Sequence, residues 1–165
     1  MASHPIRKLE PRSPYYTHVV WSALLNREIG VTATEDDFDL ELKLGYAQKF
    51  ADSLNSLTKQ CQLDFFDAAK RYYDDTFDRF AIPAIDMSTH AGIRSAITFP
   101  TYLLIPANAS NKTVVYLESE CKWHPELGLQ ALIRDGKLLY LGPGGGIDDP
   151  FAEFINGQEW WNYTN

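Results

Sequence analysis

The sequence predicts an α+β fold: a single domain in which a mainly antiparallel sheet packs against two adjacent helices. Two apolar stripes with helical spacing lie between a β-rich segment near the N-terminus and further β-rich segments after residue 82. Near the C-terminus, Asp135-Gly136 separates two apolar runs, which is the strongest short-range signal of a β-hairpin. No repeat or linker divides the chain. We therefore expect an irregular N-terminal arm over residues 1–14 and one domain over residues 15–165.

The first elements of the domain are expected to form a hairpin. Residues 1–14 contain three prolines and little apolar sequence, which is typical of an irregular segment. Tyr15–Leu25 is rich in β-branched and aromatic residues, and Ile29–Thr34 can pair with it through a turn at Asn26–Glu28.

Two helices are expected next. Thr34 is predicted to cap the first helix, and Asp37 three residues later completes a pattern like a capping box. Apolar residues then recur with helical spacing in two stripes: Leu40, Leu44, Ala47, Ala51 and Leu54, then Leu63, Phe66, Ala69, Tyr73, Phe77 and Phe80. One helix across both stripes would be unusually long. We therefore predict helices near Asp36–Leu54 and Gln60–Phe80, separated by a break near Asn55–Lys59.

The remaining elements are predicted to be strands. Ile93–Phe99 and Tyr102–Ile105 are expected to be strands divided at Pro100, where a bend or an edge is favoured. Val114–Glu118 is a further strand, and Leu127–Arg134 and Lys137–Leu141 form the hairpin that turns at Asp135-Gly136. One helical turn is expected over Asp148–Phe154.

Composition and charge restrict the classes of function. The 165 residues carry a net charge of −7, which argues against a nucleic-acid partner because phosphate neutralisation requires clustered lysine and arginine. No apolar run is long enough for a membrane helix and no signal peptide is recognisable, so we expect a cytoplasmic protein without a membrane partner. The four histidines are far apart and the two cysteines form no metal-binding pair. We expect neither a metal nor a cofactor.

A bend between two predicted strands is the candidate ligand site. Trp123, His124 and Glu126 lie there, where Pro125 restricts the backbone and Gly128 permits a positive φ. A histidine beside a carboxylate is suited to ligand binding or acid–base chemistry. The alternative is structural: Trp123 packs in the core, Glu126 caps a turn and His124 is solvated. No nucleophile motif supports an enzyme.

Two other groups of residues are candidates for binding a protein partner. Asp36, Asp37, Asp39 and Glu41 form an acidic cluster that could dock on the basic cleft of a partner protein, or could be an ordinary solvated helix face. Trp160 and Trp161 near the C-terminus have the residue type of an interface hot spot. The same segment could equally fold back onto the domain.

The residues around the bend resemble those of a bacterial domain family of unknown function, whose members occur near polymorphic toxin genes. The resemblance rests on the strand-ending cysteine, a Trp-x-x-Glu-x-Gly motif and the glycine-containing hairpin: Cys121, Trp123, Glu126, Gly128, Leu129, Asp135, Gly136 and Gly142. The family has a histidine where this chain has Leu127. The resemblance implies a non-catalytic immunity protein that neutralises a toxin by binding it. The alternative is a small-molecule-binding or hydrolytic domain that uses the Trp123–Gly128 bend.

Overall fold

The computed structural model describes residues 4–10, 14–34, 39–106, 113–153 and 161–164. Within these residues, seven strands form one sheet in sequence order: β1 (Arg7–Lys8), β2 (His18–Ser22), β3 (Arg27–Ala33), β4 (Ile97–Ile105), β5 (Val114–Cys121), β6 (Leu129–Arg134) and β7 (Lys137–Gly142). The helical elements are the 3₁₀-helix η1 (Glu41–Lys43) and the α-helices α1 (Leu44–Asn55), α2 (Lys59–Arg79) and α3 (His90–Ala96). Among the described residues, no helix has the length and apolar character needed to cross a bilayer.

The sheet is antiparallel except at one pair of strands. β3 and β4 are parallel, because all the helices lie between them in the sequence and return the chain to the end of the sheet from which β3 began. Within the arm that was expected to be irregular, Arg7 and Lys8 form β1 and pair with β2. The α+β fold with a mainly antiparallel sheet is confirmed.

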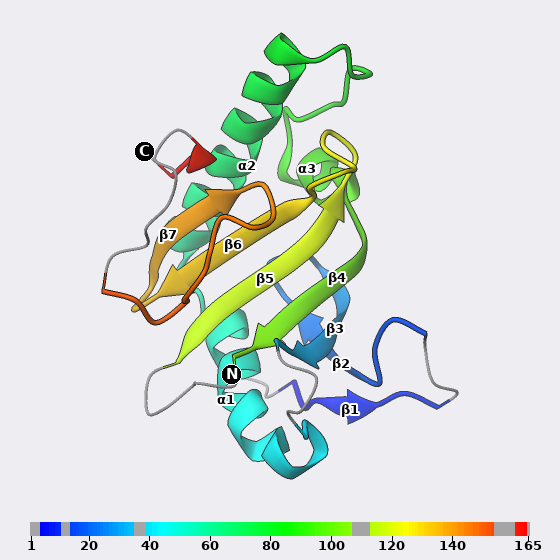
Figure 1. Cartoon of the computed structure of the whole chain (residues 1–165), viewed down its shortest axis with the longest axis vertical. Helices are drawn as coiled ribbons and strands as arrows, with labels where there is room; N and C mark the ends of the chain where they lie inside the picture. Colours follow the sequence, from blue (N-terminus) through cyan, green and yellow to red (C-terminus); the bar gives the residue numbers. More distant parts are fainter. Residues whose placement is uncertain (1–3, 11–13, 35–38, 107–112, 154–160, 165) are drawn as a thin grey trace.

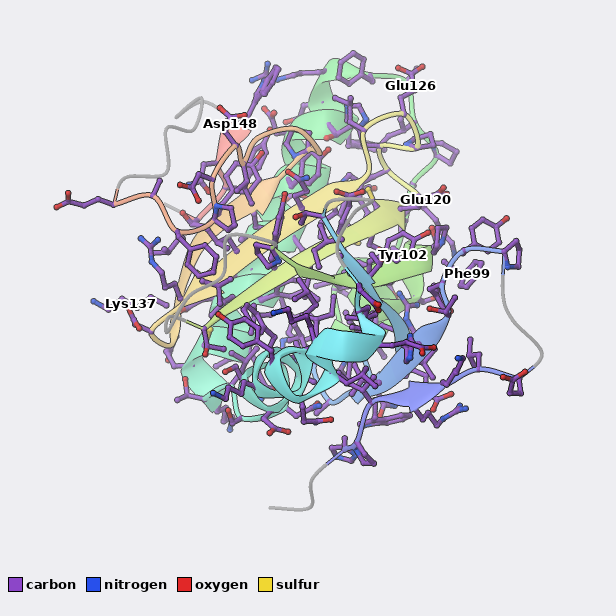
Figure 2. The ribbon with its side chains drawn as sticks, turned by 60° about the horizontal axis from the view of Figure 1, so that its bottom comes forward. Phe99, Tyr102, Glu120, Glu126, Lys137 and Asp148 are labelled. Atoms are coloured by element: carbon purple, nitrogen blue, oxygen red, sulfur yellow. The ribbon has the colours of Figure 1, made fainter. Side chains whose placement is uncertain are left out.

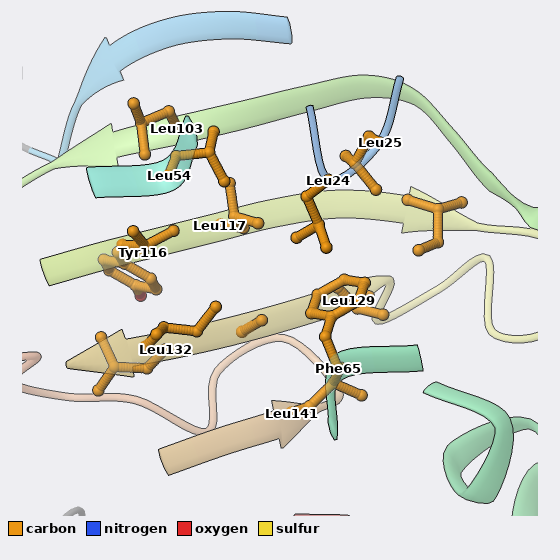
Figure 3. Close-up of a cluster of buried hydrophobic side chains, with 14 of the residues drawn as sticks. Leu24, Leu25, Leu54, Phe65, Leu103, Tyr116, Leu117, Leu129, Leu132 and Leu141 are labelled. Carbon is orange, nitrogen blue, oxygen red and sulfur yellow. The ribbon is translucent and has the colours of Figure 1, made fainter. Parts of the chain in front are cut away.

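The helices α1 and α2 cover one face of the sheet and enclose the core (Figure 1). Leu54 of α1 lies beside Leu103 and Leu117, which belong to neighbouring strands (Figure 3). These three side chains are at most 1% exposed. Because side chains alternate along a strand, the residues next to Leu103 and Leu117 point to the opposite face, which we call the outer face.

The start of the first helix was predicted wrongly. α1 begins at Leu44, preceded by η1, and not near Asp36. Thr34 does not cap this helix, because its N–H donates to the carbonyl of Ile105 (3.1 Å) and continues the β3–β4 pairing, and the residue at the cap position of α1 is Lys43. The break between the helices and the end of α2 at Arg79 agree closely with the prediction.

The segment expected to begin a strand at Ile93 instead forms α3. Thr89 caps this helix, since its hydroxyl accepts a hydrogen bond from the N–H of Gly92 (3.0 Å). A Cβ at Gly92 would lie 2.2 Å from the carbonyl oxygen of Asp86, so this close packing requires glycine. Burial of Ile93 and Ala96 on one side of the helix outweighs the strand propensity of the isoleucine.

The later strands follow the prediction. Pro100 lies inside β4 at an interruption of the pairing with β5 between Thr98 and Thr101, which is where a proline can be accommodated. The hairpin β6–β7 turns at Asp135 (φ 52°) and Gly136 (φ 72°), and the positive angles fit the expected two-residue turn. The described part of the expected turn over Asp148–Phe154 contains no helix, and Phe154 lies outside the described residues.

Candidate functional site

The Trp123–Gly128 bend is held in place by contacts from three directions. Gly128 has φ +62°, and a Cβ there would lie 2.4 Å from the carbonyl oxygen of Ser119, so only glycine fits. The Gly128 N–H donates to the His124 carbonyl (2.7 Å), and the Tyr72 hydroxyl donates to the Gly128 carbonyl (3.0 Å). Gly144 N–H donates to the carbonyl of Leu127 (2.9 Å). The bend is therefore a fixed structure.

Trp123 lies in the hydrophobic core and is 0% exposed. The edge of its ring meets the Tyr72 ring at 5.7 Å between centroids, in a T-shaped arrangement. Its Nε1 has no hydrogen-bond partner among the described residues, yet this atom is itself buried. The indole therefore packs the core and does not present its donor to a ligand at the surface.

His124, Glu126 and Cys121 do not assemble into catalytic machinery. His124 is half-buried against Tyr72, and its Nδ1 accepts a long hydrogen bond from the Leu127 N–H (3.4 Å). Glu126 is exposed, and no hydrogen bond between it and His124 is found within the described part of the chain. Burial raises the pKa of Cys121 to about 12, so its thiol stays protonated at neutral pH and is a poor nucleophile.

A hollow of about 330 Å³ lies on the helix side of the bend. Its lining comes from α2, the segment after it and the bend: Thr76, Phe80, Ile82, Trp123, His124, Pro125 and Glu126. The size is at the lower end of pockets that hold small molecules, which are roughly 300–1,000 Å³. This hollow brings together all three residues predicted from the sequence to bind a ligand.

Only part of the predicted acidic cluster lies within the described residues. Asp36 and Asp37 lie outside the described residues. Asp39 is exposed, and its carboxylate accepts a hydrogen bond from the N–H of Glu41 (3.0 Å). Glu41 forms an ion pair with Lys8 of β1. These contacts order the start of the helical region, so part of the acidic charge has a local structural use.

The C-terminal segment folds back onto the domain. Trp160 lies outside the described residues, and Trp161 is half-buried. The Tyr163 N–H donates to the carbonyl of Leu141 in β7 (2.9 Å), and the Tyr163 hydroxyl donates to Asp75 of α2 (2.5 Å). The Tyr163 ring also stacks on Tyr72 at 5.0 Å. The segment thus closes the sheet edge at β7.

An aromatic surface that was not predicted lies on the outer face of the sheet. The strand register aligns Gly30, Tyr102, Glu118 and Gln130 in one row across four strands. Tyr16 covers Gly30 in this row, because a Cβ at Gly30 would lie only 2.2 Å from the Tyr16 ring. A glycine inside a strand is therefore what allows the tyrosine to lie flat on the sheet.

The rings of this surface contact one another at its rim. Phe99 meets Tyr15 at 5.0 Å and Tyr16 at 5.8 Å, and Tyr16 meets Tyr102 at 5.9 Å, all edge to face. Tyr15 is 53% exposed and Phe99 is 55% exposed. Two large rings thus pack on each other in solvent, whereas large apolar side chains usually lie inside a protein.

Carboxylates lie beside these rings. A second hollow, of about 190 Å³, is lined by β4, β5 and the bend: Pro100, Tyr102, Glu118, Ser119, Glu120, Pro125, Glu126, Leu127 and Gly128. Figure 2 shows Glu126, Glu120, Tyr102 and Phe99 in succession along one side of the molecule, with Asp148 and Lys137 on the opposite side. We define the outer-face patch as the rings and acids of this region together with one exposed leucine: Tyr15, Tyr16, Phe99, Tyr102, Glu118, Glu120, Glu126 and Leu127.

In the part of the chain that the structure describes, no ion pair is found at the acids of the outer-face patch. Burial raises the pKa of Tyr102, and Tyr16, Glu118 and Glu120 act in the same direction. Glu118 accepts a hydrogen bond from the side-chain amide of Gln130 (3.0 Å). The ion pairs among the described residues are Arg7–Glu28, Lys8–Glu41, Lys70–Asp74 and Arg79–Asp75. None of them involves an acid of the patch, which is therefore a region of net negative charge.

A family model described as "Domain of unknown function (DUF6985)" matches residues 6–147. A comparison with curated proteins found no match, and a comparison with solved structures found none either.

Proposed function

The chain belongs to this domain family of unknown function, and we propose that it is a small bacterial, cytoplasmic interaction protein that binds a protein partner. In this proposal it is an immunity protein, and the partner is a toxin that it neutralises by direct contact. No catalytic step is part of the activity. Two separate observations support the proposal. One is the family resemblance around the bend, and the other is the set of exposed rings and acids in the outer-face patch.

The exposed pair Tyr15–Phe99 is the observation that carries the proposal. Interfaces are enriched in aromatic side chains, and their central residues are rings that lose contact with water on binding. Tyr15 and Phe99 are more than half exposed and are fixed by contact with each other and with Tyr16. Because these rings are already positioned, a partner that covers them would gain apolar burial at little cost in side-chain entropy.

The charge of the same region favours a basic partner. Glu118, Glu120 and Glu126 add negative potential to a chain that already carries −7. Long-range attraction to a basic surface accelerates association, and complementary charges select the correct partner. We therefore place the main contact on the outer-face patch. The predicted acidic cluster, Asp36, Asp37, Asp39 and Glu41, would make a smaller contribution by attracting a basic partner during association.

The proposal is tested by co-expression with the toxin domain encoded beside the gene. We expect the neighbouring gene to encode a large protein with a variable C-terminal toxin domain, and co-expression of the chain to restore growth of cells that make this domain. Phe99→Ser should abolish this protection. Phe77→Ser removes a phenyl ring that is 43% exposed on α2, so it is the matched control and should protect as wild type does.

The possible outcomes test the immunity function and the binding surface separately. Growth that is not restored by the wild-type chain would contradict the immunity function. Full protection by Phe99→Ser would contradict the assignment of the outer-face patch as the binding surface. Equal loss with both variants would show general sensitivity to losing exposed rings, and would also contradict it.

A second candidate function is the binding of a small apolar molecule in the 330 Å³ hollow at the bend. The mainly apolar lining formed by Phe80, Ile82 and Pro125 favours this alternative. It predicts that the uncharged apolar dye Nile red binds the folded protein, and that its binding is lost in Phe80→Asp but retained in Phe99→Ser. Absence of dye fluorescence with the wild-type protein would contradict it.

A further inference from the structure

The hollow on the outer face has the chemistry of a site for a single cationic side chain. It is open to solvent, and its lining includes the acids Glu118, Glu120 and Glu126 and the aromatic residue Tyr102. We propose that it receives the side chain of an arginine from the bound partner. This inference rests on the proposed function and names the group that the outer-face patch recognises.

The size of the hollow fits one long side chain. Its volume of about 190 Å³ is smaller than pockets for drug-sized ligands, which are roughly 300–1,000 Å³. Pro100 and Pro125 line it on two sides and have restricted backbones. A long flexible chain with a polar end can enter such a hollow, whereas a folded element cannot.

The aromatic part of the site suits a delocalised cation. Tyr102 lies in the hollow, and Tyr16 meets it edge to face at 5.9 Å, so the position of the Tyr102 ring is fixed before a ligand arrives. Cations are attracted to the face of an aromatic ring, and a planar guanidinium also stacks on it. The aliphatic part of an arginine side chain would then lie against Leu127 and the prolines.

The carboxylates supply the matching charges. Glu118 and Glu120 are two positions apart on β5 and so point to the same face of the sheet, and Glu126 approaches from the bend. A guanidinium has five N–H donors in a fixed plane and can bind more than one carboxylate at once.

Glu120 is the residue on which to test the site. It is exposed, and Glu120→Gln keeps its shape while removing its charge, so the fold should be unaffected. Asp148→Asn is the matched control, because it removes one negative charge at a position that Figure 2 shows well separated from Glu120. Tyr102→Leu tests the aromatic contribution, since it keeps an apolar side chain but removes the ring.

The probe is a blocked tripeptide, acetyl-Ala-Arg-Ala-amide, compared with the peptide in which citrulline replaces arginine. Citrulline has nearly the same shape and no charge. Binding to the full chain is followed by nuclear magnetic resonance of backbone amides. We expect shifts at the amides of Glu120, Glu126 and Leu127 with a dissociation constant in the millimolar range. Glu120→Gln should weaken binding about tenfold, and Asp148→Asn should leave it unchanged.

Three results would overturn the inference. They are equal binding of the citrulline peptide, equal weakening by Asp148→Asn, and the absence of shifts at the hollow throughout the millimolar range. Retained affinity in Tyr102→Leu would contradict the aromatic contribution. The titration requires no toxin, so its failure would leave the immunity function standing. A failure of growth protection would overturn that function without affecting the titration.

Discussion

The hydroxyl of Tyr72 donates a hydrogen bond to the carbonyl of Gly128 across 56 positions of sequence, at 3.0 Å. This contact ties the middle of α2 to the bend that separates the two hollows. The same tyrosine meets the ring of Trp123 on one side and stacks on Tyr163 on another. Tyr72 therefore joins the helix, the bend and the C-terminal segment.

Loss of this hydroxyl should destabilise the whole fold. Tyr72→Phe leaves the Gly128 carbonyl without its buried donor, and we expect a loss of about 1–3 kcal/mol in the free energy of unfolding. Urea unfolding measures the change. Tyr102→Phe removes the same atom from a ring that is only half-buried and should change stability by less than about 0.5 kcal/mol. Equal effects in the two variants would contradict the role of the Tyr72–Gly128 contact.

Trp123 should contribute to stability through packing. Trp123→Ala removes a fully buried indole and should cost about 3–5 kcal/mol. Trp123→Phe retains a ring and removes the unpartnered Nε1 donor, so its cost should be clearly smaller. Thermal unfolding compares the two variants. Unchanged stability in Trp123→Ala would show that the ring is not part of the core.

His18 should make stability depend on pH in the acidic range. It is 2% exposed, and burial lowers its pKa below the ordinary 6.5, with Glu41 opposing the shift and Lys8 adding to it. The folded state thus disfavours protonation, so this contribution is complete above about pH 6.5 and is lost as the pH falls below it. His18→Gln should show a smaller loss of stability between about pH 7 and about pH 5 than wild type. Parallel pH profiles of the two proteins would contradict the prediction.

The hydrogen bond between Tyr163 and Asp75 should be measurable as a coupling between the C-terminal segment and α2. A double-mutant cycle with Tyr163→Phe and Asp75→Asn should give a coupling of about 0.5–1 kcal/mol, because the contact is charge-assisted but partly solvated. Asp74→Asn is the control, since Asp74 pairs with Lys70. A coupling to Tyr163 that is as large for Asp74 as for Asp75 would argue against a specific contact.

Local signals in the sequence predicted the elements that depend on local physics. The turn at Asp135-Gly136 follows from the positive φ angles that this pair accepts, and the break before Lys59 follows from the interruption of two apolar stripes. The start of α1 and the existence of α3 depend on tertiary contacts. Examples are the Thr34–Ile105 hydrogen bond and the fit of Gly92 against Asp86, which no local pattern reports.

The outer-face patch was missed for the same reason. Tyr16 and Tyr102 are far apart in sequence and meet only because β3 and β4 are parallel neighbours. Of two signals in the sequence, Pro100 was interpreted as a bend or an edge and Gly30 was not interpreted. Gly30 within a β-rich segment indicates a close approach by another group, and Pro100 within a strand indicates a bulge. By contrast, Trp123, His124 and Glu126 lie within four consecutive positions, which is why the bend could be identified from the sequence.

Hydrogen–deuterium exchange of the chain, free and bound to the toxin domain that it protects against, tests the central claim most directly. The account predicts slower exchange on binding in Ile97–Ile105 of β4, in Val114–Cys121 of β5 and at the bend. The exposed side of α2 should exchange at the same rate in both states. Slowing confined to Glu41–Lys43 and the start of α1, with β4 and the bend unchanged, would contradict the assignment of the outer-face patch as the binding surface.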